Sequence, residues 1–219
     1  MNVGVLGTGV VGQTIGTALV HAGHDVRMGS RTADNTTAAQ WAAHHQGGRA
    51  SHGTFADAAA FGEYVFNCTS GQVTLDVLSA AGAEHLAGKV LVDVSNPLDF
   101  SQGFPPSLTV CNTDSIGEQV QRAFPDVRVV KALNTMAAAV MVDPASLREP
   151  SDVFVAGNDD DAKSAARAFL EQFGWAPERI RDLGGIEASR GLEAYLLLWV
   201  RLMTALNGPT FNVRLVDGA

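Results

Sequence analysis

The sequence predicts an α/β fold in which helices cover both faces of a doubly wound parallel sheet. Three observations support this prediction. Short apolar runs alternate with helical patterns along most of the 219 residues, the first run leads into a glycine-rich turn, and a helical pattern follows that turn. Strands that alternate with helices pair in parallel, because right-handed crossovers return the chain to the same end of the sheet. Such Rossmann-type sheets bind ligands beyond the carboxyl ends of their strands.

Apolar runs and turn signals give the expected elements in order. Runs typical of buried strands occupy residues 3–6, 63–68, 89–94, 127–131 and 153–156, another strand ends near Met28 or Gly29, and a short one lies near Ala50. Helical patterns occupy residues 11–22, 38–45, 73–87 and 186–206. An alternating run predicts a last short strand at residues 211–215.

The first strand runs directly into a Gly-x-Gly-x-x-Gly turn, and the helix after it stops at Gly23. In this order the motif is typical of a dinucleotide-binding site, whereas a glycine-rich turn without a ligand is the alternative. Gly7 permits the tight turn, Gly9 lets a pyrophosphate approach the backbone, and Gly12 lets helix and strand pack closely. The pyrophosphate would lie at the positive end of the helix. The expected cofactor segment is therefore Gly7-Thr8-Gly9-Val10-Val11-Gly12.

The end of the second strand favours NADP(H) over NAD(H). A site selective for NAD places Asp or Glu here, where it accepts hydrogen bonds from the ribose 2′-hydroxyl. This chain has Ser30, Arg31 and Thr32 instead. The guanidinium is a planar, permanently charged fork and the hydroxyls are donors, which suits a 2′-phosphate. The same stretch could be a solvated turn in which Thr32 or Asp34 caps the next helix, and the two roles are compatible.

Four segments follow predicted strands and are the places to look for ligand contacts. They are Thr69-Ser70-Gly71-Gln72, Ser95-Asn96-Pro97-Leu98, Ala132-Leu133-Asn134-Thr135-Met136 and Gly157-Asn158-Asp159-Asp160. The first three are rich in small polar groups, which suit a nicotinamide ribose and ring, although ordinary turns use the same residues. The candidate cofactor residues among them are Thr69, Ser70, Asn96, Pro97, Ala132 and Asn134. Asn134 is also the candidate for positioning the reacting groups. The acids of the fourth segment are expected to begin a helix rather than to bind a metal.

Composition excludes several classes of protein. With 46% hydrophobic and 17% charged residues, the chain can bury a sizeable core. Its net charge of −8 argues against nucleic acid or an anionic membrane as a partner. The longest apolar stretch, residues 194–200, is too short to span a bilayer, and no signal-peptide pattern opens the chain, so we expect a cytoplasmic protein. The spacing of Cys68 and Cys111 is not that of metal ligands, so no metal site is expected. We interpret Cys68 as a small core residue.

Few residues are candidates for a catalytic acid or base. Neither Tyr64 nor Tyr195 begins the Tyr-x-x-x-Lys pattern that a short-chain dehydrogenase would need. The six histidines fall in predicted helices or at helix ends, where surface positions explain them. Lys131 ends a strand and is either a general acid or a structural residue. A hydride can pass to a redox ring with little acid or base help, so flavin-like acceptors suit the chain better than simple ketones.

Together these motifs resemble those of the F420:NADP oxidoreductases. The resemblance is carried by the turn at residues 7–12, Gly29-Ser30-Arg31, Ser95-Asn96-Pro97-Leu98, Lys131-Ala132-Leu133-Asn134-Thr135 and Gly157-Asn158-Asp159-Asp160. It covers nearly the whole chain, because Gly184-Gly185, Ser189-Arg190 and Glu193 are similar to the small helical cap of that family. It implies hydride transfer between NADPH and coenzyme F420, with the two rings stacked between the Rossmann domain and the cap. It further implies that Thr8, Val10, Ser30, Arg31, Thr69 and Ala132 lie on NADP. The same family includes the NADPH-binding domains of metalloreductases, which use flavin.

The chain departs from the family pattern at positions that concern the acceptor. Members that use F420 can carry a histidine where this chain has Asn134, and another in the loop where this chain has Ser70-Gly71-Gln72-Val73. The basic residue that can follow the Ser-Arg pair is also absent, because Asp34 and Asn35 occupy that stretch. NADP binding tolerates these changes, whereas the acceptor stays open between F420, a flavin and a small organic substrate.

The C-terminal segment predicts a cap and a second chain. We expect an NADP-binding Rossmann domain over residues 1–157 and a C-terminal α/β extension with a helical cap over residues 158–219. Apolar residues recur at helical spacing from residue 186 to 206, with Gly208-Pro209 as a stop. The apolar stripe is wider than one small cap can bury, which predicts a homodimer through this helix. Arg190 and Glu193 are spaced to pair on the helix surface.

Two classes of function follow. In the first, the protein is an NADP(H)-dependent oxidoreductase whose acceptor, a deazaflavin, a flavin or a small organic substrate, lies between the nicotinamide and the cap. In the second, it is a non-catalytic NADP(H)-binding sensor of redox state. The scarcity of acid and base residues at the predicted site is compatible with both.

Overall fold

The computed structural model describes residues 1–45 and 47–218. Residue 46, in the predicted domain 1–157, and residue 219, in the predicted domain 158–219, lie outside this description. An eight-stranded sheet forms the centre, in the order β10-β9-β8-β5-β4-β1-β2-β3. Its strands are β1 (Asn2–Leu6), β2 (Asp25–Ser30), β3 (Ala50–Thr54), β4 (Tyr64–Asn67), β5 (Val90–Asp93), β8 (Arg128–Ala132), β9 (Val153–Gly157) and β10 (Ile180–Asp182). Two short strands, β6 (Leu98–Asp99) and β7 (Ser107–Leu108), form a separate antiparallel pair. The predicted Rossmann-type fold is confirmed.

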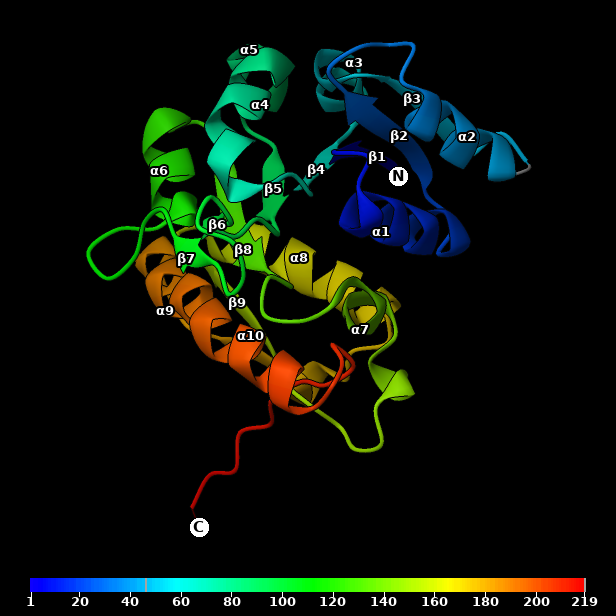
Figure 1. The fold of residues 1–219 in the computed structure, drawn as a ribbon. Coiled ribbons are helices and arrows are strands. Elements are labelled where there is room, and N and C mark those ends of the chain that lie inside the picture. The colour runs from blue at the N-terminus through cyan, green and yellow to red at the C-terminus, as the bar shows by residue number, and fades with distance from the viewer. Residues whose placement is uncertain (46, 219) are drawn as a thin grey trace.

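Helices cover both faces of the sheet (Figure 1), and the apolar core forms two clusters. One apolar cluster packs beneath α1 (Val10–His21), α2 (Thr36–His44), α7 (Ala138–Val142) and α8 (Asp160–Gln172). The other packs beneath α3 (Phe55–Phe61), α4 (Thr74–Ala81), α5 (Ala83–Leu86) and α6 (Ile116–Ala123). The central strands β1, β4, β5 and β8 are almost entirely buried and largely apolar, as in sheets with two covered faces. This arrangement leaves the strand ends as the place for a ligand.

The sheet departs from a wholly parallel arrangement at β9, which pairs with β8 in the antiparallel sense. The connection from β8 to β9, residues 133–152, contains the five-residue helix α7 and a 3-10 turn at Pro144–Ser146. In this pairing Gly157 lies opposite Val130 and Val155 lies opposite Ala132, so β9 ends beside the earlier part of β8. The segment Gly157-Asn158-Asp159-Asp160 therefore lies at the edge opposite the end of β8. Its expected place among the ligand-binding segments was wrong, whereas its acids do begin α8, with Asp159 as the N-cap.

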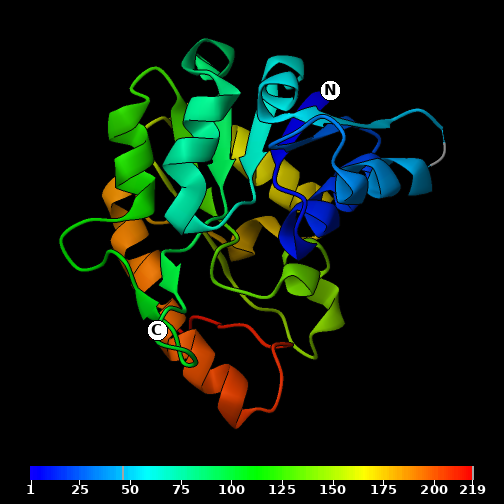
Figure 2. The same cartoon turned by 45° about the horizontal axis from the view of Figure 1, so that its top comes forward.

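The C-terminal region forms α9 (Ser189–Ala194) and α10 (Leu196–Ala205), preceded by a 3-10 turn at Ile186–Ala188. Figures 1 and 2 both place α10 at the end of the molecule away from α5. The predicted strand at residues 211–215 is wrong, because this segment forms neither a strand nor a helix. Instead it is anchored at isolated points: Asp152 donates its amide to the Val213 carbonyl at 2.9 Å, and Leu215 donates its amide to the Asp152 carboxylate at 2.6 Å.

No helix in the described part of the chain is long and apolar enough to cross a membrane.

Candidate functional site

The glycine-rich turn has the geometry that a bound pyrophosphate needs. Gly7 has φ +114°, in the left-handed region that glycine adopts without strain. A β-carbon on Gly12 would lie 2.1 Å from the Gly7 carbonyl oxygen, so this close packing of α1 requires glycine. A β-carbon on Gly9 would meet no atom within 4 Å. Gly9 is the N-cap of α1 and provides no side-chain cap, so backbone N–H groups at the positive end of the helix are available to an anion.

A cleft of about 660 Å³ lies over this turn, within the size range of cofactor sites. It is bounded by the loops after β1, β2 and β4 and by one side of α4. The predicted cofactor residues that line it are Gly7, Thr8, Gly9, Ser30, Arg31, Thr69 and Ser70, and its other lining residues are Asn35, Phe55, Cys68, Val73, Asp76, Val77 and Ala80. The glycine turn, the end of β2 and the loop after β4 therefore share one cavity, as the parallel strand ends predicted.

The other predicted cofactor residues lie outside this cleft. Val10 is exposed at the start of α1, Val11 is half-buried, Gly12 is buried against the Gly7 backbone, and Thr32 is exposed beyond β2. Asn96, Pro97, Ala132 and Asn134 lie further along the same edge, where β5 and β8 end. The structure therefore separates a phosphate and adenosine end of the predicted site from a second cluster at the ends of β5 and β8.

The end of β2 presents a positive charge to the cleft. Arg31 is exposed at its rim, and it forms no ion pair among the described residues. The buried Ser30 hydroxyl donates to the Thr32 carbonyl at 2.5 Å and so fixes the turn. The cap of α2 is Asn35, whose side-chain oxygen accepts from the Ala38 amide at 2.9 Å, so the expected cap at Thr32 or Asp34 was wrong.

The loop after β4 is held from beneath by Asn67. The Thr69 hydroxyl donates to the Asn67 side-chain oxygen at 2.7 Å, and the Asn67 amide donates to the Asp93 carboxylate at 2.8 Å. Gly71 lies so close to the neighbouring loop that a β-carbon would approach the Asn96 carbonyl oxygen to 2.4 Å. Burial raises the pKa of the Cys68 thiol well above its usual range, so this cysteine stays a neutral packing group.

Asn134 and Asn96 bond to each other at the second cluster. The Asn96 side-chain amide donates to the Asn134 carbonyl at 2.8 Å, and the Asn134 side-chain amide donates to the Asn96 side-chain oxygen at 2.9 Å and to the Leu192 carbonyl at 3.1 Å. These oxygens fix the orientation of the Asn134 amide. Its own Oδ1 is left as a buried acceptor without a partner among the described residues. Leu133, just before it, has φ 63°, an uncommon conformation for leucine that bends the chain here.

Lys131 is fully buried and its ammonium donors are all engaged. They meet the Asp93 carboxylate at 2.8 Å, the Ser95 carbonyl at 2.6 Å and the Glu193 carboxylate at 2.8 Å. Burial by itself lowers the pKa of Lys131, but the two carboxylates outweigh it and hold that pKa above its usual range. Of the two interpretations left open by the sequence, the structure supports a structural residue, because the ammonium is fully buried and its N–H groups all face protein acceptors.

The cap pairs with the rest of the protein through charges. Arg190 donates to the Glu118 carboxylate at 2.9 and 2.5 Å, and Glu193 is buried against Lys131. The expected pairing of Arg190 with Glu193 on the helix surface was therefore wrong. Spacing along one helix could not reveal these partners, because each belongs to a distant element.

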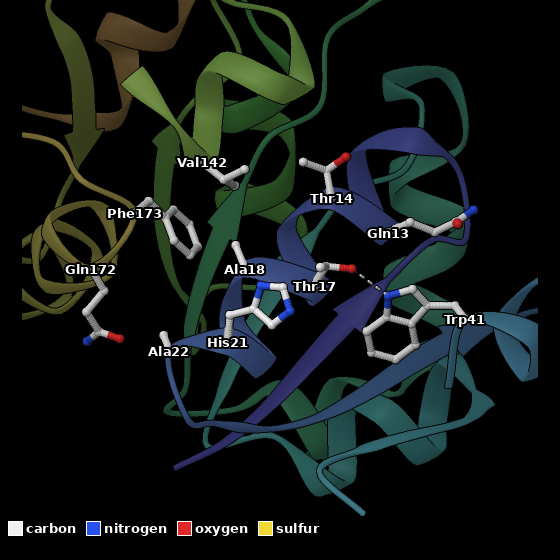
Figure 3. Close-up of a pocket in the computed structure, with 10 residues that line it drawn as sticks. All are labelled: Gln13, Thr14, Thr17, Ala18, His21, Ala22, Trp41, Val142, Gln172 and Phe173. Carbon is white, nitrogen blue, oxygen red and sulfur yellow. Dashed lines mark hydrogen bonds between the residues drawn. The ribbon is translucent and has the colours of Figure 1, made fainter. Parts of the chain in front are cut away.

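The histidines do not line the cofactor cleft. The expectation that all six are surface residues in helices or at helix ends was wrong for two of them. His24 is buried and meets the Gln172 side-chain oxygen at 2.6 Å, and His52 lies in β3. A separate hollow of about 560 Å³, shown in Figure 3, lies between α1, α2, α7 and α8. There the Trp41 indole donates to the Thr17 hydroxyl at 3.1 Å. None of the predicted site residues lines this hollow.

Comparisons with known proteins place the chain among NADP-dependent reductases. The family of NADP oxidoreductases described as coenzyme F420-dependent matches residues 2–97. An F420-dependent NADP reductase from Methanothermobacter marburgensis is 28% identical over 210 residues, which cover 92% of each chain. Metalloreductase STEAP3 from Rattus norvegicus is 29% identical over 95% of this chain, which spans 38% of that protein's length. A crystal structure of a candidate F420-dependent NADP-reductase from Arthrobacter sp. FB24 has a TM-score of 0.91 and 45% identity, and covers 98% of this chain and 99% of that one.

The fold and the cleft define the chain as a dinucleotide-binding protein of the Rossmann type. The identity of 45% over nearly the full length of the Arthrobacter protein, together with the family match, shows the family as well as the fold. The chain belongs to the family of F420-dependent NADP oxidoreductases and is an NADP-dependent oxidoreductase.

Proposed function

We propose that this protein transfers a hydride between NADP(H) and a deazaflavin or flavin-like ring, with coenzyme F420 as the first candidate. The observation that carries the proposal is the second cluster at the ends of β5 and β8. It consists of paired amides, and the nearby ammonium of Lys131 is fully engaged by Asp93, Ser95 and Glu193. A ketone or imine acceptor needs a proton donor, whereas a redox ring accepts a hydride with little such help.

The residues of the cleft fit NADP. We infer that Gly9 and the amide groups at the start of α1 bind the pyrophosphate, because that backbone is uncovered. Arg31 and Ser30 at the end of β2 would hold the 2′-phosphate. Thr69 and Ser70 face the same cleft from the loop after β4. When bound, the nicotinamide supplies the hydride, and the chain contributes orientation.

We infer that Asn134 positions the reacting groups. Its side-chain Oδ1 is buried without a partner, and an unmatched buried acceptor favours a ligand that brings an N–H donor. The carboxamide of a nicotinamide carries such a donor. The side chain is held from both sides by Asn96 and the Leu192 carbonyl, so its position is set before a ligand arrives.

We also propose a homodimer through the C-terminal helix. Leu197 and Leu198 on α10 are 46% and 54% exposed, and Leu206 follows at 60%. Leu197 and Leu198 are adjacent, and neighbouring exposed apolar side chains are typical of a surface that another chain covers. A cytoplasmic location and the domain boundary at residue 157 stay predictions.

The proposed function is tested by mixing the protein with NADPH and, in separate reactions, F420, FMN, FAD and small carbonyl compounds. Oxidation of NADPH is followed by the nicotinamide absorbance. We expect turnover with F420 or a flavin, and none with the carbonyl compounds. The control is Gly9→Val, in which the cofactor cannot approach the turn.

Two other results would replace the proposal. Turnover with carbonyl compounds alone would make the protein a reductase of small organic substrates. Tight NADPH binding without turnover of any acceptor would identify a non-catalytic NADP(H)-binding protein.

A further inference from the structure

Glu193 reaches from the cap into the body of the protein. It lies on α9, and its carboxylate is buried where α9 meets the first turn of α6 and the end of β8. One carboxylate oxygen lies 2.8 Å from the Lys131 ammonium and accepts from the Gly117 amide at 3.1 Å, and the other accepts from the Ile116 amide at 2.8 Å. Burial raises the pKa of the Glu193 carboxyl, against the attraction of Lys131. The carboxylate thus joins three elements that are distant in the sequence.

The bonds made by Glu193 continue to the cofactor cleft. Lys131 also meets Asp93 at 2.8 Å, and the other Asp93 oxygen accepts from the Asn67 amide at 2.8 Å. Asn67 in turn accepts from the hydroxyl of Thr69, which lines the cleft. A continuous series of hydrogen bonds and ion pairs therefore runs from the loop after β4, beneath the strand ends, to the cap.

This arrangement restricts where α9 can lie. A buried charge is stable only while its partners stay in place, because displacement leaves an uncompensated charge in a medium of low dielectric. Lys131 faces two carboxylates, and the excess negative charge is offset by the backbone N–H groups at the positive end of α6. The adjacent residue, Leu192, accepts from Asn134 through its carbonyl. A shift of α9 would break both attachments.

We propose that Glu193 is a positioning residue that holds α9 against the strand ends carrying Asn96 and Asn134. It thereby fixes the surface, formed by α9 and these strand ends, on which the hydride acceptor docks. The role of this surface in docking rests on the proposed function. Glu193 acts through the position of the cap and does not contact NADP or the acceptor.

Two variants of Glu193 test this role. Glu193→Ala removes the attachment of the cap and leaves Lys131 paired with Asp93, so the sheet keeps a balanced buried pair. Glu193→Gln keeps the length of the side chain and one oxygen acceptor. Asp159→Ala is the control, because it removes a helix cap at the opposite edge and lowers stability without touching α9.

Three measurements separate positioning from a loss of stability. In Glu193→Ala we expect the NADPH Kd to stay within about twofold of wild type. With F420 or the best flavin as acceptor, we expect a higher acceptor KM, a kcat lower on the order of tenfold to a hundredfold, and a larger isotope effect with NADPH deuterated at the transferred position. Amide hydrogen exchange should accelerate at residues 116–117 and 189–194. Glu193→Gln should recover most of each change, and Asp159→Ala should show none.

Opposite results would overturn the proposal. If Glu193→Ala loses activity only in proportion to folded protein, with the acceptor KM and the isotope effect unchanged, Glu193 has only a structural role. Unchanged hydrogen exchange at residues 189–194 would show that it does not hold α9. If none of the tested acceptors supports NADPH oxidation by the wild-type protein, the proposed function is wrong. Hydrogen exchange then still decides whether Glu193 holds the cap in position.

Discussion

Arg31 is the residue that we propose to carry cofactor selectivity, on the basis of its surroundings. It lies at the rim of the cleft with no ion pair among the described residues, so its charge is available to a ligand. The turn beneath it is fixed by the bond from Ser30 to the Thr32 carbonyl. The ribose phosphate of NADP carries the charge and acceptor oxygens that a guanidinium fork matches. NAD lacks that phosphate, and the second strand ends without an acid to bind its free hydroxyl.

Arg31→Ala should weaken NADPH binding by roughly tenfold to a hundredfold, because a charge-assisted fork contributes on the order of 1.5 to 3 kcal/mol. NADH binding should barely change. Fluorescence titration of both cofactors provides the measurement. Arg148→Ala is the matched control, since it removes an exposed arginine outside the cleft. Equal losses for NADPH and NADH would contradict the assignment of Arg31 to the 2′-phosphate.

Gly9→Val should abolish NADPH binding and leave the fold intact. The backbone at Gly9 has φ −73° and ψ −177°, which valine adopts without strain, and a β-carbon there meets no protein atom within 4 Å. The only space it fills is that of the cofactor. Circular dichroism and NADPH titration of the same sample test both parts. Gly12→Val is the contrast, because its β-carbon would overlap the Gly7 carbonyl and should impair folding. A folded Gly9→Val protein that binds NADPH normally would rule out this site.

The sequence predicted local features of the site better than its distant contacts. The roles of Gly7, Gly9 and Gly12 follow from a short motif whose backbone geometry is nearly independent of the rest of the chain. The buried attachment of Lys131 to Glu193 could not be predicted in this way. Its partners come from separate elements, and neither spacing nor hydrophobic period links them.

At the scale of elements, the direction of β9 decides which strand ends can bind a ligand. Because β9 is antiparallel to β8, the acids at the start of α8 lie at the edge away from the cleft. The sequence shows a strand followed by an acidic helix start, which is the same pattern at either edge. The connection at residues 133–152 is long enough for either direction, so its length does not reveal how β9 runs, and the helix α7 within it was not predicted. The helix α3 was not predicted either, although the capping box formed by Thr54 and Asp57 at its start is a signal that the sequence carries.

Asp159→Ala should lower the free energy of unfolding by about 0.5–2 kcal/mol, because it removes the acceptor for the Ala162 amide at the start of α8. NADPH affinity should not change. Asn35→Ala is the matched variant at the other edge, where the lost cap belongs to α2 and the side chain also lines the cleft. It should lower both stability and NADPH affinity. Urea unfolding and NADPH titration give the two quantities. Weaker NADPH binding in Asp159→Ala would mean that the two edges are coupled.

The whole molecule combines a well-covered sheet with an uncovered cap. The two core clusters lie beneath helices on both faces of the sheet, whereas α10 buries Leu196 and Val200 and leaves Leu197 and Leu198 exposed. One chain has no element that covers this side of α10 among the described residues. The apolar stripe seen in the sequence therefore has a buried side and an exposed side, which is the pattern that predicts a second chain.

Leu198→Glu should convert a homodimer into a monomer. Burial of a leucine in an interface contributes roughly 1.5–3 kcal/mol, and a carboxylate in its place would have to lose its hydration. Light scattering after size-exclusion chromatography should give twice the chain mass for wild type and the single-chain mass for the variant. Leu183→Glu makes the same change at an exposed leucine outside α10 and should stay dimeric. NADPH affinity should be the same in all three proteins, because the cleft belongs to one chain. If the wild-type protein is a monomer, the proposed homodimer is wrong and does not explain the exposed side of α10.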